Sequence, residues 1–131
     1  MKLRIHGNSI RLRLTRSEVE RFAHDGSIES VLNFGPAPAR HLSYGLVTSP
    51  QPECMAVKYS PDRITIFVSP ALAKDWTTTE RIAISDRQPL SDEAHLDILV
   101  EKEFGRLRDA QPDPDLYPNP LRNKRSPQEG R

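Results

Sequence analysis

The sequence predicts an α+β protein with a mostly antiparallel, curled sheet of about seven to eight strands. Short runs of apolar residues alternate with polar ones, and this period of two is typical of half-buried strands. Turn-forming residues separate successive runs, which favours local hairpins. Two segments carry helix signals, and no alternation of strand and helix of the kind found in parallel sheets is evident.

The N-terminal residues predict a tight β-hairpin, in which Gly7-Asn8 forms the two-residue turn. Apolar and basic residues alternate on both sides of that turn, so we expect them on opposite faces of the hairpin. The apolar set is Leu3, Ile5, Ile10, Leu12 and Leu14, and the basic set is Lys2, Arg4, His6, Arg11 and Arg13.

An amphipathic helix is predicted directly after this hairpin. Thr15 and Glu18 have the spacing of a capping box, in which each residue bonds the backbone of the other. Val19, Phe22 and Ala23 form the apolar stripe, and Gly26 suits a left-handed helix end.

The remaining pattern predicts further strands and one short helix. Ser69-Pro70 has the signature of a helix start, and we expect that helix to run through Trp76. No internal repeat of solenoid length is evident. The expected strands cover residues 28–34, 42–46, 55–59, 64–68, 81–84 and 95–104.

The length of 131 residues and the proline distribution predict one folded domain with a C-terminal tail. Residues 1–104 form the domain, and residues 105–131 form a proline-rich extended tail. We expect this tail to dock around residues 116–120 and to fray beyond residue 123.

Composition excludes several classes of protein. The formal net charge of +1 provides no overall attraction to nucleic acid or anionic membrane. The single cysteine, Cys54, cannot form a disulfide within the chain. Because no apolar run approaches about 18 residues, we expect a cytoplasmic protein without a membrane partner. The histidine spacing indicates no metal site, and glycine loops for phosphate and nucleophile elbows are absent, so no catalytic residue, metal or cofactor is predicted.

Charged residues provide the candidate site. Asp97, Glu101 and Glu103 fall on the outer face of the last predicted strand, whereas the hairpin presents Arg4, Arg11 and Arg13. If these strands are neighbours, the two sets form a cross-strand ladder of opposite charges. Such a ladder is either a structural ion-pair network or a binding face. In the second interpretation the arginines grip a phosphate or carboxylate, and Glu101 and Glu103 hold a metal.

Two resemblances add to this interpretation. The run GNSIRLRLTRSEVE resembles the swapped-hairpin DNA-binding domains of the AbrB/MazE type, although Leu14-Thr15 replaces the expected proline. That resemblance implies a dimer in which Arg11 and Arg13 contact DNA. The MKLRIHGNSIRLRLTRSEVE opening, the LVEKEF strand and the YPNP segment resemble an uncharacterised family of small bacterial proteins, which implies a shared fold but no activity.

The sequence therefore favours a non-enzymatic binding or interaction module that uses its charged sheet face. The expected partner is a protein or a small anionic ligand, and the oligomeric state stays open. One alternative is a binder of anionic ligands or a metal-dependent hydrolase, with arginine clamps and Glu101 and Glu103 as ligands. The other is a DNA-binding dimer, with nucleic acid the least favoured partner.

Overall fold

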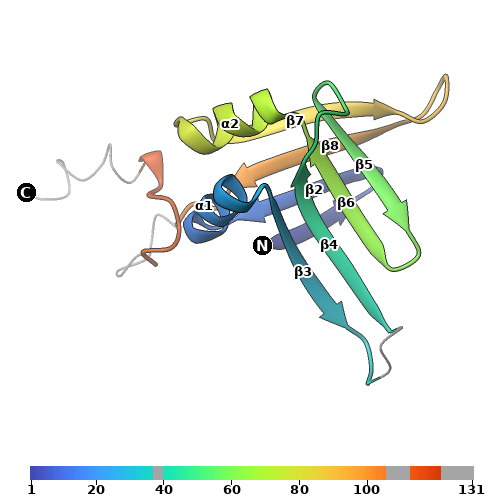
Figure 1. The fold of residues 1–131 in the computed structure, drawn as a ribbon, viewed down its shortest axis with the longest axis horizontal. Coiled ribbons are helices and arrows are strands. Elements are labelled where there is room, and N and C mark those ends of the chain that lie inside the picture. The colour runs from blue at the N-terminus through green and yellow to red at the C-terminus, as the bar shows by residue number, and fades with distance from the viewer. Residues whose placement is uncertain (37–39, 106–112, 122–131) are drawn as a thin grey trace, which may run out of the picture.

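The computed structural model describes residues 1–36, 40–105 and 113–121, which contain two helices and eight strands (Figure 1). The α+β class and the predicted order of elements are confirmed. The helices are α1 (Arg16–Asp25) and α2 (Pro70–Thr78). The strands are β1 (Lys2–His6), β2 (Ser9–Leu14), β3 (Ser27–Asn33), β4 (His41–Thr48), β5 (Met55–Ser60), β6 (Arg63–Val68), β7 (Ala83–Pro89) and β8 (His95–Lys102).

The strands form two four-stranded sheets rather than the single curled sheet that was predicted. Sheet A has the order β1-β2-β8-β7, and sheet B has the order β3-β4-β6-β5. Each sheet joins two antiparallel hairpins through one central parallel pair, β2–β8 or β4–β6. Both sheets are therefore mostly antiparallel, as predicted, and each contains one hairpin from each half of the chain.

The two halves of the chain repeat the same unit of hairpin, helix and hairpin. Strand β6 lies 54 positions after β2, and β8 lies 54 positions after β4. The registers agree with this offset, because β2 pairs Ser9 with Asp97 and β6 pairs Arg63 with Ser43. The chain thus contains a structural duplication in which the two halves exchange hairpins. Its period of 54 residues is longer than the repeats of solenoid proteins.

Hydrogen bonds outside the strand ladders follow the same correspondence. The amide of Asp97 donates to the carbonyl of Asn8 at 3.1 Å, and the amide of Ser43 donates to the carbonyl of Asp62 at 2.8 Å. At the 54-residue offset, Ser43 corresponds to Asp97 and Asp62 corresponds to Asn8. Each half therefore makes the same contact with the other half.

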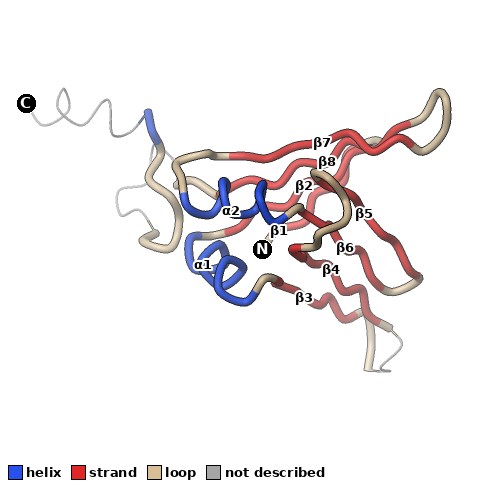
Figure 2. The backbone as a smooth tube through the Cα atoms, turned by 45° about the horizontal axis from the view of Figure 1, so that its top comes forward, coloured by secondary structure: helices blue, strands red, loops and turns tan. Residues whose placement is uncertain are grey.

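The core lies between the sheets and the helices. Figure 2 shows both helices at one end of the sheets, with the hairpins extending away from them. The largest fully buried side chains include Phe22 of α1 and Trp76 of α2. Lys102 ends β8 on this inner side, where its ammonium group donates to the carbonyl of Thr79 at 2.8 Å. Burial lowers the pKa of Lys102, although the charge of Glu80 opposes this shift.

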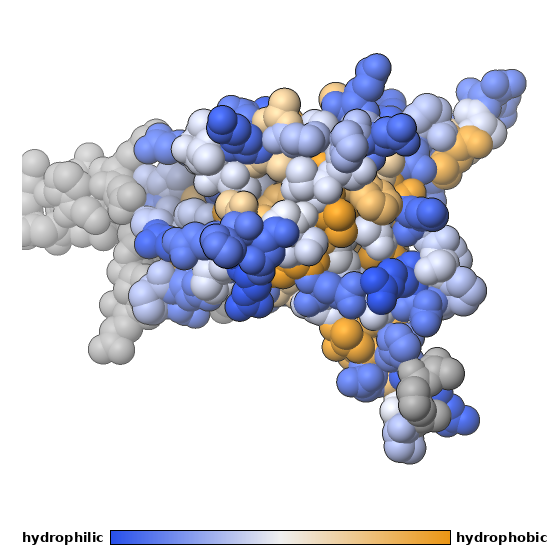
Figure 3. Space-filling model, in the orientation of Figure 1, coloured by the Kyte–Doolittle hydropathy of each residue, from blue (hydrophilic) through white to orange (hydrophobic). Residues whose placement is uncertain are grey.

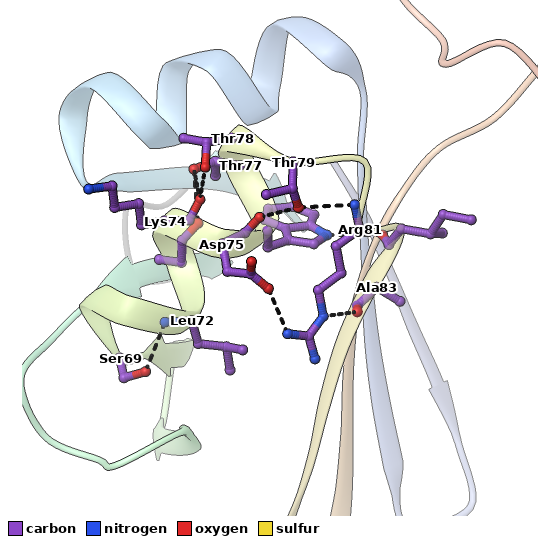
Figure 4. Close-up of polar contacts among 12 residues, drawn as sticks. Ser69, Leu72, Lys74, Asp75, Thr77, Thr78, Thr79, Arg81 and Ala83 are labelled. Atoms are coloured by element: carbon purple, nitrogen blue, oxygen red, sulfur yellow. Dashed lines mark hydrogen bonds and ion pairs between the residues drawn. The ribbon is translucent and has the colours of Figure 1, made fainter.

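Both helices begin at the predicted caps. Thr15 and Glu18 form the capping box, and Gly26 ends α1 in the left-handed region at φ 77°. The hydroxyl of Ser69 accepts a bond from the amide of Leu72 at 3.3 Å, as Figure 4 shows. Helix α2 continues two residues beyond the predicted end at Trp76.

The strand bounds differ from the predicted ranges, most of all at β7. The strand expected at residues 81–84 begins at Ala83 and continues to Pro89, because pairing with β8 extends it beyond its apolar residues. The last strand ends at Lys102 rather than at Phe104.

The described part of the tail lies against the domain. Tyr117 forms an isolated bridge with Phe104, and their ring centroids are 5.7 Å apart. The carboxylate of Asp115 accepts the backbone amide of Ser17 at the start of α1 at 2.9 Å. The predicted fraying beyond residue 123 lies outside the described residues.

Candidate binding face

The solvent-facing side of sheet A carries all six residues predicted as a site, and we call it the charged face. Its opposite side carries Ile10, Leu12, Ile98 and Val100, which are buried. Strand alternation therefore turns Arg11, Arg13, Asp97 and Glu101 to the outside. The charged face consists of Lys2, Arg4, His6, Ser9, Arg11, Arg13, Ala83, Ser85, Arg87, Pro89, His95, Asp97, Leu99, Glu101 and Glu103.

Oppositely charged residues meet on this face because β2 and β8 are neighbours. The Nε atom of Arg13 lies 2.6 Å from Oε1 of Glu101. Arg11 contacts the same oxygen at 3.7 Å, so Glu101 serves two guanidinium groups. The ammonium group of Lys2 pairs with Glu103. The predicted condition, that the two charged strands are neighbours, is therefore met, and their side chains form a cross-strand ladder of opposite charges.

Arg87 also belongs to the charged face, although the sequence pattern did not predict it as a site residue. Its Nε atom lies 3.1 Å from Oδ1 of Asp97 on the neighbouring strand. Its strand was expected to end at residue 84, since the following Ser-Asp-Arg-Gln-Pro run lacks apolar alternation. Only the pairing of β7 with β8 extends the strand as far as Arg87.

The carboxylates of the ladder already have cationic partners. Glu101 contacts Arg11 and Arg13, and Glu103 contacts Lys2. Within residues 1–36, 40–105 and 113–121, no three His, Cys, Asp or Glu side chains gather closely enough to hold a metal ion. The arrangement therefore favours neutralisation of these acids over their use as metal ligands.

One corner of the charged face carries excess positive charge. Arg4 lies opposite Arg11 in the register of β1 and β2, with His6 next along the strand. Arg4, His6, Ser9 and Arg11 line a hollow of about 160 Å³, and we call these four residues the cationic corner. In the part of the chain that the structure describes, Arg4 makes no ion pair or side-chain hydrogen bond.

A larger groove adjoins the cationic corner. It has a volume of about 520 Å³ and shares Ser9 and Arg11 with the hollow. Its other lining residues on the charged face are Ser85, Arg87, Asp97 and Leu99. The hollow and the groove together consequently extend across the charged face from β1 to β7.

The second half of the chain lacks an equivalent basic face. At the offset of 54 positions, Thr65 corresponds to Arg11 and Phe67 corresponds to Arg13. The resemblance to swapped-hairpin domains implied a dimer with a basic arm from each chain. Here one chain contains both hairpin–helix units, and only the first hairpin carries these arginines.

Comparison with known protein families provides a match. The model of DUF7009, a family of unknown function, matches residues 1–121. This result agrees with the predicted membership of an uncharacterised family, while bacterial origin stays a prediction. No curated protein and no solved structure matches the chain. In its described parts, no helix is both long enough and apolar enough to cross a membrane.

Proposed function

We propose a binding function for this chain, which belongs to the family of unknown function DUF7009. The protein is a non-enzymatic interaction module that holds an acidic segment of a protein partner at the cationic corner. The observation that supports this proposal is the charge balance of the face: each ladder carboxylate has a cation, whereas Arg4 has no carboxylate among the described residues.

The side chains at the corner suit carboxylate recognition. Arg4 and Arg11 lie opposite one another on adjacent strands, and a guanidinium group can bind both oxygens of a carboxylate. Glu101 contacts Arg11 from the other side, so this arginine is oriented before a partner arrives. An acidic segment would also relieve the repulsion between the two arginines.

A protein partner would use more of this surface than a small ligand. The hollow alone, at about 160 Å³, is smaller than typical small-molecule pockets of roughly 300–1,000 Å³, whereas the adjoining groove of about 520 Å³ falls within that range. The neighbouring groove continues the polar surface across β2, β8 and β7. A partner that spans several strands would therefore use more of the face than a single phosphate or carboxylate ion.

The test is a fluorescence-anisotropy titration with a short, labelled peptide of alternating glutamate and valine. We expect saturable binding that Arg4→Glu weakens by about tenfold, which corresponds to about 1.4 kcal/mol. Lys58→Glu is the matched control, because Lys58 is exposed and lies 54 positions after Arg4 on the edge strand β5. Both variants change the net charge equally.

Two results would contradict the proposal. Equal losses in Arg4→Glu and Lys58→Glu would indicate non-specific attraction, and an absence of binding by the wild-type protein would remove its basis. The same titration includes inorganic phosphate and duplex DNA as competitors. Displacement by phosphate at equal potency would favour the anionic-ligand alternative, and tighter binding of DNA would favour the nucleic-acid alternative.

A further inference from the structure

The two edge strands that correspond at the 54-residue offset, β1 and β5, have different surroundings. The edge of β5 is covered by side chains from β7. Gln88 accepts the amide of Val57 through Oε1 at 2.6 Å, and its Nε2 donates to the carbonyl of the same residue at 3.3 Å. The carboxylate of Asp86 accepts the amide of Met55 at 3.1 Å. These bonds satisfy main-chain groups that point away from β6.

The edge of β1 lacks this cover. Leu3 is the counterpart of Val57, and its main-chain groups point away from β2 in the same manner. In β3, which corresponds to β7 at an offset of 56 positions, the residue at the position of Gln88 is Leu32. A leucine side chain cannot form the bonds that Gln88 makes. Among the described residues, no side chain bonds the outward groups of Leu3 or Ile5.

An apolar side chain is exposed on this edge strand. Ile5 is 63% exposed although it lies on the inner side of sheet A. Leu32 is 49% exposed, and Figure 3 shows apolar surface over the far end of β3. The exposure of Ile5 next to main-chain groups that have no protein partner among the described residues is typical of an edge at which another strand can dock.

The side chains of β1 indicate what kind of strand would fit. Every outward side chain on its charged-face side is basic, namely Lys2, Arg4 and His6, and the inner side carries Leu3 and Ile5. A complementary strand therefore has acidic residues at every second position and apolar residues between them.

We propose that an extended segment of the partner, alternating acidic and apolar residues, adds to β1 as a fifth strand of sheet A. This inference rests on the proposed function, because the acidic side chains would contact the cationic corner. The main chain of the segment would bond the outward groups of Leu3 and Ile5, and its apolar side chains would cover Ile5.

A second copy of the same chain fits this edge poorly. If two β1 strands paired antiparallel with their basic sides on the same face of the sheet, basic residues would lie opposite basic residues in every register. Like charges that lie directly opposite one another destabilise a strand pair. The charge pattern thus favours a different, acidic partner over self-association.

Amide hydrogen exchange on the wild-type protein tests the added strand directly. In the presence of the alternating glutamate–valine peptide, we expect at least about tenfold slower exchange at Leu3 and Ile5. A peptide of the same composition in Glu-Glu-Val-Val blocks cannot place all acidic residues on one face, and we expect it to bind more weakly. Binding without protection at Leu3 and Ile5 would overturn the added strand while leaving the proposed function intact. Absence of peptide binding by the wild-type protein would contradict both the added strand and the proposed function.

A proline variant gives an independent measurement. Ile5→Pro removes an amide that points away from β2, and proline is tolerated at such edge positions. We expect it to weaken peptide binding by about tenfold, and Ile5→Ala separates the contribution of the lost side chain. Tyr59→Pro is the matched control, since Tyr59 lies 54 positions later on the edge strand β5 and is 72% exposed. Equal binding by Ile5→Pro and Tyr59→Pro, with circular dichroism confirming that both fold, would overturn the inference.

Discussion

The aromatic rings of Phe22 and Trp76 pack against each other with their centroids 6.3 Å apart and their planes tilted by 59°. These residues are 54 positions apart, and they occupy equivalent sites on α1 and α2. Both side chains are fully buried. The contact therefore joins the helices of the two halves at the centre of the duplicated fold.

Removal of the Phe22 ring from this contact should destabilise the whole domain. We expect Phe22→Ala to lower the free energy of unfolding by about 3–5 kcal/mol, because it removes a buried ring and leaves a cavity. Urea denaturation followed through the fluorescence of Trp76, the single tryptophan, measures this change. Phe34→Ala is the control, since Phe34 is 68% exposed, and its effect should stay within about 0.5 kcal/mol. Similar effects of the two substitutions would contradict the central role of Phe22.

Gly45 should not tolerate a side chain. A Cβ atom at this position would lie 2.7 Å from the carbonyl oxygen of Ile28 on the neighbouring strand, and that backbone cannot move freely. We expect Gly45→Ala to cost about 1–3 kcal/mol in thermal or urea unfolding. At Gly105 the nearest atom to an added Cβ is 3.8 Å away, so Gly105→Ala is the control. Equal stability of the two variants would show that β3 and β4 can separate without cost.

Acid should destabilise the start of α1 through Glu18. Burial alone raises the pKa of this carboxyl, but hydrogen bonds from the amino group of Met1 and from Thr15 outweigh it and lower the pKa overall. The stabilisation is consequently present above the pKa of Glu18 in the unfolded chain, and it is lost as the pH falls through the lowered pKa of the folded state.

The measurement is the free energy of unfolding between neutral and acidic pH for the wild type and Glu18→Gln. We expect the variant to be less stable at neutral pH and to lose less stability on acidification. Parallel pH profiles would rule out Glu18 as a source of acid sensitivity. Glu20→Gln is a suitable control, because Glu20 is exposed on the same helix.

The ion pair between Arg13 and Glu101 should contribute little to stability. The side chain of Arg13 is 42% exposed, so solvent screens the interaction, and Arg11 shares the same carboxylate. A double-mutant cycle with Arg13→Ala and Glu101→Ala should give a coupling energy of about 0.2–1 kcal/mol, decreasing at high salt. A coupling of several kcal/mol that resists salt would instead assign a structural role to this pair.

Much of the local structure could be predicted because it depends on neighbours in the sequence. The capping residues Thr15 and Glu18, the left-handed end at Gly26 and the cap at Ser69 all act within one helical turn. The faces of the N-terminal hairpin follow from its alternation. The burial of Lys102 could not be predicted in this way, because a lysine at the end of an apolar strand faces inward only when Trp76 and Tyr117 provide its surroundings.

The candidate site was predictable in composition but not in geometry. Alternation alone places Arg11 and Arg13 on one face of the hairpin and Glu101 on one face of its own strand. Whether those strands are neighbours depends on a pairing between residues 88 positions apart, such as Arg13 and Glu101. Arg87 was missed for the same reason, since its strand is extended by β8.

The sequence by itself therefore determined the class, the order of elements and the two helix starts, because these depend on contacts over a few residues. The tertiary structure decided which hairpins share a sheet, how the two halves exchange them and where positive charge remains at the surface. Strand pairing requires only compatible faces, and many pairings meet that condition locally. In the structure both helices pack over one core, and β2 lies beside β8 through a pairing of residues 88 positions apart.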